Sequence, residues 1–277
     1  MQKYACLSID VEVDPGRENM IPLLFSDREK LSCLKEILQK NLVPLTAFIV
    51  MRDVNLFKCG LDDLCKNIDV ELGTHSYSHI QKISASKEEV DKSFEDFFNI
   101  WGYPPLGYRA PNTLINHLGI KNLIKKGYSY DGSIVPSIRF DEFHYNNLGY
   151  SRNPFKFVYN GSELIELPVA TMARIRIPLI FSYVKLFGLS TYRVMSYAFP
   201  FPNQLVLYLH PYDLYPAECK DGFSKPWKKL AHLRNSGREF KILDKLIKLL
   251  LKRGYKFITM GKLAKTLENE EIAKVFI

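Results

Sequence analysis

The sequence lacks the features that mark membrane-spanning, fibrous and repeat proteins. It has no run of about 18 apolar residues, which a transmembrane helix requires, and no internal repeat, linker or low-complexity segment. Its 277 residues are 47% apolar and 25% charged, which is ordinary for a globular protein. We therefore expect a single domain over residues 1–277 with a sizeable core.

Cysteine is present without a pairing pattern. The number is odd, and no two cysteines are spaced as Cys-x-x-Cys. Such usage predicts free thiols in a reducing compartment. The N-terminus also lacks the charged region and apolar segment of a secretory signal. Both absences lead us to expect a cytoplasmic protein. The cysteines are Cys6, Cys33, Cys59, Cys65 and Cys219.

The net charge is +8, with a pI near 9.1, and favours anionic partners. A well-solvated basic surface explains the charge equally simply. Nucleic acid is not an expected partner, because no recognised binding module accompanies the charge. Much of the excess lies in residues 241–256, alternating with Leu and Ile as on an amphipathic helix. With the apolar stretch 174–198, it suits peripheral contact with an anionic membrane, at its inner face in a cytoplasmic protein.

Apolar periodicity predicts strands alternating with helices. This alternation indicates an α/β fold with a parallel sheet or barrel and right-handed crossovers. We expect residues 136–200, irregular at first and then apolar and basic, to be a lid-like insertion over one end. The expected strands cover residues 4–10, 46–50, 67–73, 163–169, 204–209 and 255–260. The expected helices cover residues 27–40, 56–66, 86–101, 116–126 and 240–252.

Two histidines, His75 and His79, follow one of these strands. Gly73 permits a sharp turn there, and Thr74 is a suitable helix N-cap. If a helix follows, both imidazoles lie on one face and can bind one metal ion. From the spacing alone, an accidental pair on a polar helix face is equally compatible.

The two histidines belong to a larger set of chemically reactive residues that follow expected strands. Along the chain the set consists of acids, the two histidines, an arginine, a further acid and a further histidine. In a parallel sheet the carboxyl ends of the strands meet at one edge, so these side chains are expected to lie together. Individually, Arg-Ala-Pro and Asp-Gly are ordinary turn signals. These residues are Asp10, Glu12, Asp14, His75, His79, Arg109, Asp131 and His210.

The ordered set resembles the polysaccharide deacetylase family, also called NodB homology or carbohydrate esterase family 4, over residues 4–262. The resemblance implies a distorted (β/α) barrel of the NodB deacetylase type. It also implies removal of acetyl groups from N-acetylated sugars with a divalent metal. Zinc is the expected metal, with cobalt, nickel and manganese as alternatives.

The resemblance assigns a role to each matching residue. The family's second acid directly follows the first, whereas this chain has Val11 there, so Glu12 takes its place as in relatives with Asp-x-Glu. The implied metal ligands are Glu12, His75 and His79, with Asp14 as a substitute for Glu12. The implied catalytic residues are Asp10 as general base, Arg109 holding it, His210 as general acid and Asp131 orienting His210. The implied substrate-binding residues are Leu207, which lines the acetyl-methyl pocket, Pro111 and Tyr212.

The expected partner is a saccharide, either a polysaccharide or a lipid- or nucleotide-linked sugar of surface-polysaccharide assembly. Two other functions remain open on the same fold. One is an amidohydrolase of small cyclic or formyl amides, with or without metal. The other is a sugar-binding relative without turnover, against which the intact set of residues speaks. The sequence does not specify an oligomeric state.

Overall fold

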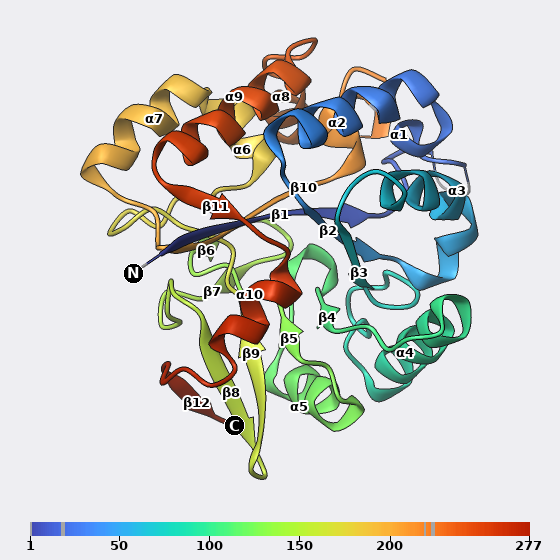
Figure 1. Cartoon of the computed structure of the whole chain (residues 1–277), viewed down its shortest axis with the longest axis vertical. Coiled ribbons are helices and arrows are strands. Elements are labelled where there is room, and N and C mark those ends of the chain that lie inside the picture. Colours follow the sequence, from blue (N-terminus) through green and yellow to red (C-terminus); the bar gives the residue numbers. More distant parts are fainter. Residues whose placement is uncertain (1, 18–19, 219, 223–224) are drawn as a thin grey trace.

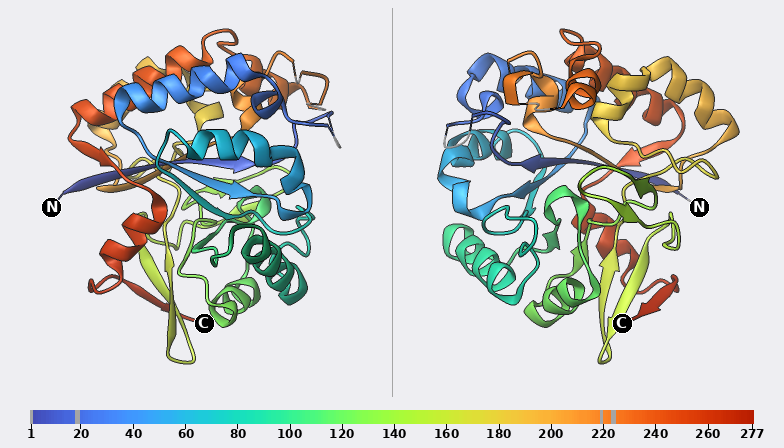
Figure 2. Two further views of the ribbon diagram at one scale, coloured as in Figure 1. Left: turned by 45° about the vertical axis from the view of Figure 1, so that its right-hand side comes forward. Right: turned by 180° about the vertical axis from the view of Figure 1, so that it is seen from behind.

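The computed structural model describes residues 2–17, 20–218, 220–222 and 225–277, excluding the side chains of residues 227, 228 and 231. It shows a central sheet covered by helices (Figures 1 and 2). In these ranges no helix has the length and apolar character needed to cross a membrane. Four cysteines have free thiols, as expected, and Cys219 lies outside the described residues.

The main sheet is almost entirely parallel. Its order is β10-β1-β2-β3-β4-β5-β9-β8-β12, with β11 also paired to β1, and only β8 and β9 are antiparallel neighbours. The strands are β1 (Lys3–Val11), β2 (Leu45–Ile49), β3 (Val70–Thr74), β4 (Gly107–Tyr108), β5 (Tyr130–Asp131), β8 (Phe155–Tyr159), β9 (Ser162–Glu166), β10 (Gln204–Leu209), β11 (Tyr255–Phe257) and β12 (Lys274–Phe276).

The sheet curls toward closure without forming a complete ring of strands. After β9 the chain returns beside β10, where Val169 forms an isolated parallel bridge with Val206. On its other side, the Leu167 amide donates to the Asp131 carbonyl at 2.9 Å. This segment therefore lies between β5 and β10. The predicted α/β class and barrel-like arrangement are confirmed, although no closed barrel is present among the described strands.

Helices pack on the outside of the curled sheet. Helices α2 and α9 contact each other across one face (Figure 1). The helices are α1 (Leu23–Ser26), α2 (Arg28–Asn41), α3 (Val54–Cys65), α4 (Lys87–Trp101), α5 (His117–Lys126), α6 (Phe181–Phe187), α7 (Leu189–Ala198), α8 (Pro226–Leu233), α9 (Glu239–Lys252) and α10 (Met260–Leu267). Short 3-10 turns are η1 (Met51–Asp53), η2 (Pro111–Thr113), η3 (Pro211–Leu214) and η4 (Lys220–Gly222).

Strand β1 illustrates how the sequence positions the site. Leu7 and Ile9 lie in the main core between the sheet and its helices. Because strand side chains alternate between faces, Ser8 and Asp10 point to the opposite, inner side of the sheet. Both are buried there. The inner end of β1 therefore delivers polar groups to the interior of the curled sheet.

The expected insertion is divided by the main sheet. Strands β8 and β9 belong to that sheet, so residues 136–200 are not one separate lid. The rest of the range includes a small hairpin, β6 (Ile138–Arg139) with β7 (Tyr145–Asn146), and the helices α6 and α7. The prediction of a single inserted region was therefore too coarse.

Candidate functional site

The two histidines lie on a loop, so the condition of a helix after Gly73 is not met. Residues 75–86 form bends and turns. Ser76 and His79 have φ values of 62° and 61°, a left-handed conformation that an α-helix cannot contain. The Ser76 hydroxyl accepts from the His79 amide at 3.0 Å and fixes this turn.

A buried carboxylate from α4 holds the histidine loop. Glu89 Oε2 accepts from the backbone amides of Tyr77 at 3.1 Å and Ser78 at 2.8 Å. Ser86 caps α4, because its hydroxyl accepts from the Glu89 amide. The Glu89 side chain, however, stabilises the loop instead of completing a capping box. This long-range contact replaces the helical geometry that the sequence suggested.

Glu12, His75 and His79 converge on one point, with their candidate ligand atoms within 4.8 Å of one another. Glu12 Oε2 lies 2.5 Å from His79 Nε2 and 3.9 Å from His75 Nε2. His75 Nδ1 lies 2.8 Å from the Arg109 carbonyl, to which it donates, leaving Nε2 free for a metal. Asp14 is turned away, accepting from the Leu23 amide at 2.7 Å, and is not part of this cluster.

The donor set fits a divalent metal. His79 Nε2 is buried and lies against Glu12 Oε2, another member of the cluster. Two imidazole nitrogens and one carboxylate form a common catalytic zinc set, which leaves a coordination position open. Burial lowers the pKa of His75 to about 4, so its imidazole is neutral, as a ligand must be. Burial would raise the pKa of Glu12, but His79, His210 and His75 lower it to about 2.

Asp10 and Arg109 form a buried ion pair beside this cluster. Arg109 Nη1 donates to Asp10 Oδ1 at 2.7 Å and to the Ser8 hydroxyl at 2.9 Å. Its Nε donates to the Gly132 carbonyl at 3.0 Å. Asp10 Oδ2 is left facing His210 Nε2, 4.0 Å away. The arrangement holds one Asp10 oxygen in place and leaves the other toward the cavity.

His210 follows β10 and is held by Asp213. Asp213 Oδ2 accepts from the His210 amide at 2.9 Å and lies 3.2 Å from His210 Nδ1. Its other oxygen, Oδ1, lies 3.1 Å from His232 Nδ1. Burial would lower the pKa of His210, but Asp213, Glu12 and Asp10 raise it to about 9. At this pKa the imidazole is protonated at neutral pH, and its Nε2 lies 3.8 Å from Glu12 Oε1.

Asp131 does not orient His210, so that prediction is wrong. Its Oδ1 accepts from the Ser133 hydroxyl at 2.6 Å. Its other partner is Glu166, and burial raises the pKa of both carboxyl groups. Two such groups in contact share a proton, which gives Asp131 a structural place behind Arg109. The turn η3 supplies Asp213 to His210 instead.

A cavity of about 270 Å³ joins the Glu12–His75–His79 cluster, Asp10 and His210. Tyr212 lines it, as expected, and stacks on the His210 ring at 4.7 Å. The other described residues that line it are Asp10, Glu12, Pro15, His75, His79, Asn112, Thr113, Arg139, Asp141, Tyr145, Ile180, Ser182, Tyr183, Tyr208, His210, Gly222 and His232.

Two expected substrate-binding residues lie elsewhere. Leu207 is fully buried in the main core, so its assignment to the acetyl-methyl pocket is wrong. Strand alternation puts Tyr208 on the cavity side instead. Counting Leu-x-His back from His210 also gives position 208. Pro111 is buried beside the cavity, but Asn112 and Thr113 line it.

Sequence reasoning missed several residues of the site. Asp213 had a local signal, because His-x-x-Asp on a helical turn brings both side chains to one face. His232 and Arg139 come from α8 and the β6–β7 hairpin, and no local pattern marks either residue. Arg139 pairs with Asp141 at 2.8 Å at the cavity wall. These contacts depend on the packing of segments distant in sequence.

Comparisons with known proteins give a fold and a partial domain match. The matching family model is described as a domain of unknown function (DUF3473) and covers residues 132–265, just under half of the chain. No curated protein matches the sequence.

Solved structures match over nearly the whole chain. A candidate polysaccharide deacetylase from Mycobacterium smegmatis is 17% identical, with a TM-score of 0.61, covering 100% of this chain and 94% of its own. A CE4 family pseudoenzyme from Bacillus anthracis is 14% identical (TM-score 0.54; 100% and 70% covered). The Bc1960 peptidoglycan N-acetylglucosamine deacetylase is 16% identical (TM-score 0.54; 94% and 87% covered). The chain has the fold of these polysaccharide deacetylases, as the resemblance predicted.

Proposed function

We propose that this protein is a metal-dependent hydrolase that removes the acetyl group from an N-acetylated sugar. The observation that supports this most strongly is the meeting of three groups in one cavity. These are the Glu12–His75–His79 cluster, the Asp10–Arg109 pair and the His210–Asp213 pair. Amide hydrolysis needs an activated water, a base and a proton donor for the leaving amine, and the three groups correspond to these needs.

The proposal rests on these residues more than on the fold. One structural neighbour is a CE4 family pseudoenzyme, so the fold alone does not imply turnover. In this chain the three proposed ligands lie close together, and the proposed base and acid each have a charged partner. A pseudoenzyme under no selection for chemistry would not need to retain both pairs.

A divalent ion held by Glu12, His75 and His79 would polarise the amide carbonyl and lower the pKa of water. Asp10 accepts the proton of the attacking water at Oδ2. Arg109 holds Asp10 in place by binding Oδ1, and its positive charge offsets the repulsion between Asp10 and Glu12. The Arg109 carbonyl also fixes the ring of His75. One arginine residue thus positions both the base and a ligand.

His210 delivers a proton from Nε2 to the nitrogen of the leaving amine. Asp213 stabilises its imidazolium form and fixes the ring by binding Nδ1. Tyr212 stacks on the ring and restricts its rotation. Asp10 Oδ2 and His210 Nε2 lie 4.0 Å apart at the wall of one cavity, so both can reach the same amide group.

The cavity supports a small sugar substrate. Its volume of about 270 Å³ is near the lower end for small-molecule sites, which suits a single sugar unit. Tyr145, Tyr183 and Tyr208 offer ring faces and hydroxyls, and Arg139 adds hydrogen-bond donors. We infer zinc as the metal because two imidazoles and one carboxylate match its preference.

Acetate release tests the proposal. Metal-loaded protein is incubated with N-acetylglucosamine oligomers, nucleotide-linked N-acetylglucosamine and, separately, cyclic and formyl amides. We expect acetate from an N-acetylated sugar, and a loss of about 10²–10⁴-fold in Asp10→Asn with metal content unchanged. Hydrolysis of a cyclic or formyl amide only, or normal turnover by Asp10→Asn, would contradict the substrate class or the assigned base, respectively.

A further inference from the structure

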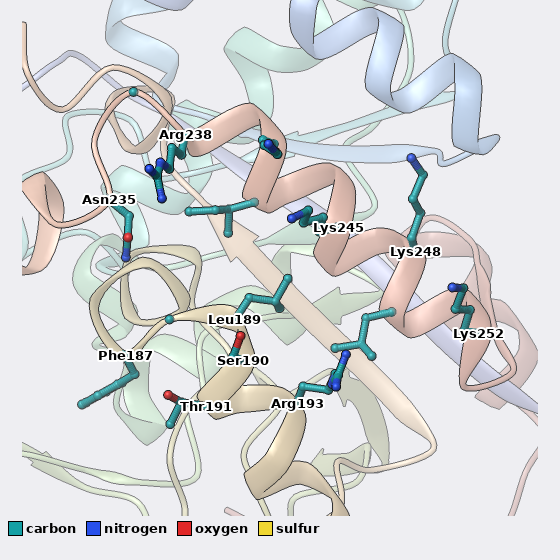
Figure 3. A pocket seen from close by; sticks show the side chains of 15 residues that line it. Phe187, Leu189, Ser190, Thr191, Arg193, Asn235, Arg238, Lys245, Lys248 and Lys252 are labelled. Atoms are coloured by element: carbon teal, nitrogen blue, oxygen red, sulfur yellow. The ribbon is translucent and has the colours of Figure 1, made fainter.

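A second and larger hollow lies between α7 and α9, outside the catalytic cavity. Its volume is about 960 Å³, and it shares no lining residue with that cavity (Figure 3). Figure 3 shows α9 with its lysines along one rim and Arg193 of α7 on the other. We call it the basic groove. Its lining residues are Phe187, Gly188, Leu189, Ser190, Thr191, Arg193, Asn235, Gly237, Arg238, Lys241, Ile242, Lys245, Lys248, Leu249 and Lys252.

The cations of α9 form one stripe along the groove. Lys241, Lys245, Lys248 and Lys252 are spaced by four, three and four residues, which places them on one helix face. The opposite face of α9 is buried in the core. Packing of that apolar face fixes the rotation of the helix and so directs the lysine stripe outward.

The positive charge of the groove is largely unbalanced within the chain. Six of its lining residues are cationic and none is acidic. Lys248 pairs with Asp244 at 2.6 Å. Lys241, Lys245 and Lys252 make no ion pair with any described residue. Like charges at this spacing repel one another, so an anion bound from outside would relieve a cost already present in the fold.

Exposed apolar side chains adjoin the basic groove on α7. Val194 is 66% exposed and Tyr197 is 76% exposed. Tyr197 lies four residues after Arg193, so the two share a helix face, and its ring lies against Arg253 at 4.8 Å. Large apolar groups beside a cationic stripe are typical of helices that lie at a membrane interface.

We propose that the basic groove binds the phosphate headgroups of an anionic lipid bilayer, with Val194 and Tyr197 entering the boundary of the acyl chains. A soluble diphosphate offers the same negative charge, but it would make no use of these two exposed side chains. This surface is independent of the deacetylase proposal, because none of its residues lines the catalytic cavity.

Sedimentation with vesicles tests the proposal without any substrate. The full chain is mixed with vesicles of phosphatidylcholine alone or with phosphatidylglycerol added. We expect binding only to the anionic vesicles, weakened by salt. The variant Lys241→Gln/Lys245→Gln/Lys252→Gln should bind on the order of one hundredfold more weakly, at about tenfold or less per lysine.

Two matched controls separate the groove from general effects. Lys66→Gln/Lys82→Gln/Lys125→Gln removes the same charge from exposed positions elsewhere and should bind like wild type. Val194→Ser/Tyr197→Ser should bind anionic vesicles several-fold more weakly. Its control, Leu118→Ser/Phe276→Ser, alters positions that are 65% and 76% exposed and should not.

Three results would overturn the proposal. The first is no binding of wild type to anionic vesicles. The second is equal loss in both lysine variants, which would make binding a matter of net charge. The third is vesicle binding that the Val194→Ser/Tyr197→Ser variant retains in full. Inorganic pyrophosphate tests the alternative of a soluble diphosphate ligand. It is titrated into the protein, and binding is measured as a rise in the temperature of thermal unfolding. Saturable stabilisation without vesicle binding would assign the groove to a soluble ligand.

Discussion

Two charged pairs, Asp10–Arg109 and His210–Asp213, flank the Glu12–His75–His79 cluster. The protein holds them in different ways. Arg109 and Asp10 lie inside the curled sheet, with side-chain exposures of 0% and 3%. His210 lies on a turn after β10, and 18% of its side chain is exposed, although Asp213 behind it is buried. The proposed base is therefore held inside the curled sheet, and the proposed acid by the turn that follows β10.

Because of this difference, the two pairs should contribute differently to the stability of the fold and to turnover. A buried ion pair that loses one partner leaves an uncompensated charge, which is strongly destabilising. Arg109 also packs over the Phe48 ring at 4.4 Å. The His210 side chain is partly exposed, so water can solvate a charge that loses its partner there. Substitutions of Arg109 should affect both folding and turnover, whereas those around His210 should affect mainly turnover.

Arg109→Met is expected to have the largest effect. It should lower the free energy of unfolding by about 3–5 kcal/mol, because Asp10 is left buried and unpaired. Urea unfolding measures the change. Arg52→Met is the control, because its pair with Asp53 is exposed and should contribute less than about 1 kcal/mol. Equal stability of the two variants would show that the Asp10–Arg109 pair does not stabilise the core.

His210→Gln should leave the unfolding midpoint close to that of wild type but lower kcat by about 10²–10⁴-fold. The loss should be greatest for substrates whose leaving amine is strongly basic, because these need the proton most. An activated aryl acetamide, with a weakly basic amine, should lose much less. The same loss for both substrates would contradict the role of His210 as general acid.

Asp213→Asn should change the pH dependence and lower kcat by about 10–100-fold. His210 must be protonated to act, so activity falls as pH rises through its pKa. The Asp213 carboxylate raises this pKa, so removing it should move the alkaline limb to lower pH. Asp131→Asn is the matched comparison and should leave the limb in place. A shift in Asp131→Asn alone would restore the original assignment of Asp131.

His232→Ala should have the smallest effect of the series. It removes one of two histidines that bind Asp213, while the bond from Asp213 to His210 remains. The loss of one hydrogen bond corresponds to less than about a tenfold decrease in kcat. A decrease as large as that of Asp213→Asn would show that the two histidines act as one unit.

The sequence predicted the Asp10–Arg109 pair better than the surroundings of His210. Asp10 and Arg109 were placed correctly, because strand periodicity and the order of motifs determine which side chains meet at strand ends. Asp131 was assigned to orient His210 because the family resemblance carries roles over by motif. The carboxylate that contacts His210 is instead Asp213, in the turn after β10. Leu207 was assigned one position too early, which in a strand reverses the face.

The histidine pair shows a further limit. Its spacing predicted that the two imidazoles lie together, as they do, but no helix follows Gly73, since Glu89 from α4 holds the loop. Local propensity cannot reveal a buried carboxylate that is supplied by a later helix. His232 was missed for the same reason. The meeting of the two imidazoles was thus predictable, but the backbone conformation that brings them together was not.

Metal content measures the central claim most directly. Wild type, Glu12→Ala and His144→Ala are loaded with zinc, desalted and analysed by mass spectrometry, with His144 as an exposed histidine outside the cluster. We expect about one zinc ion per chain in wild type and His144→Ala, as three protein ligands require, and a loss in Glu12→Ala. No metal in wild type, or full retention in Glu12→Ala, would contradict the proposed site.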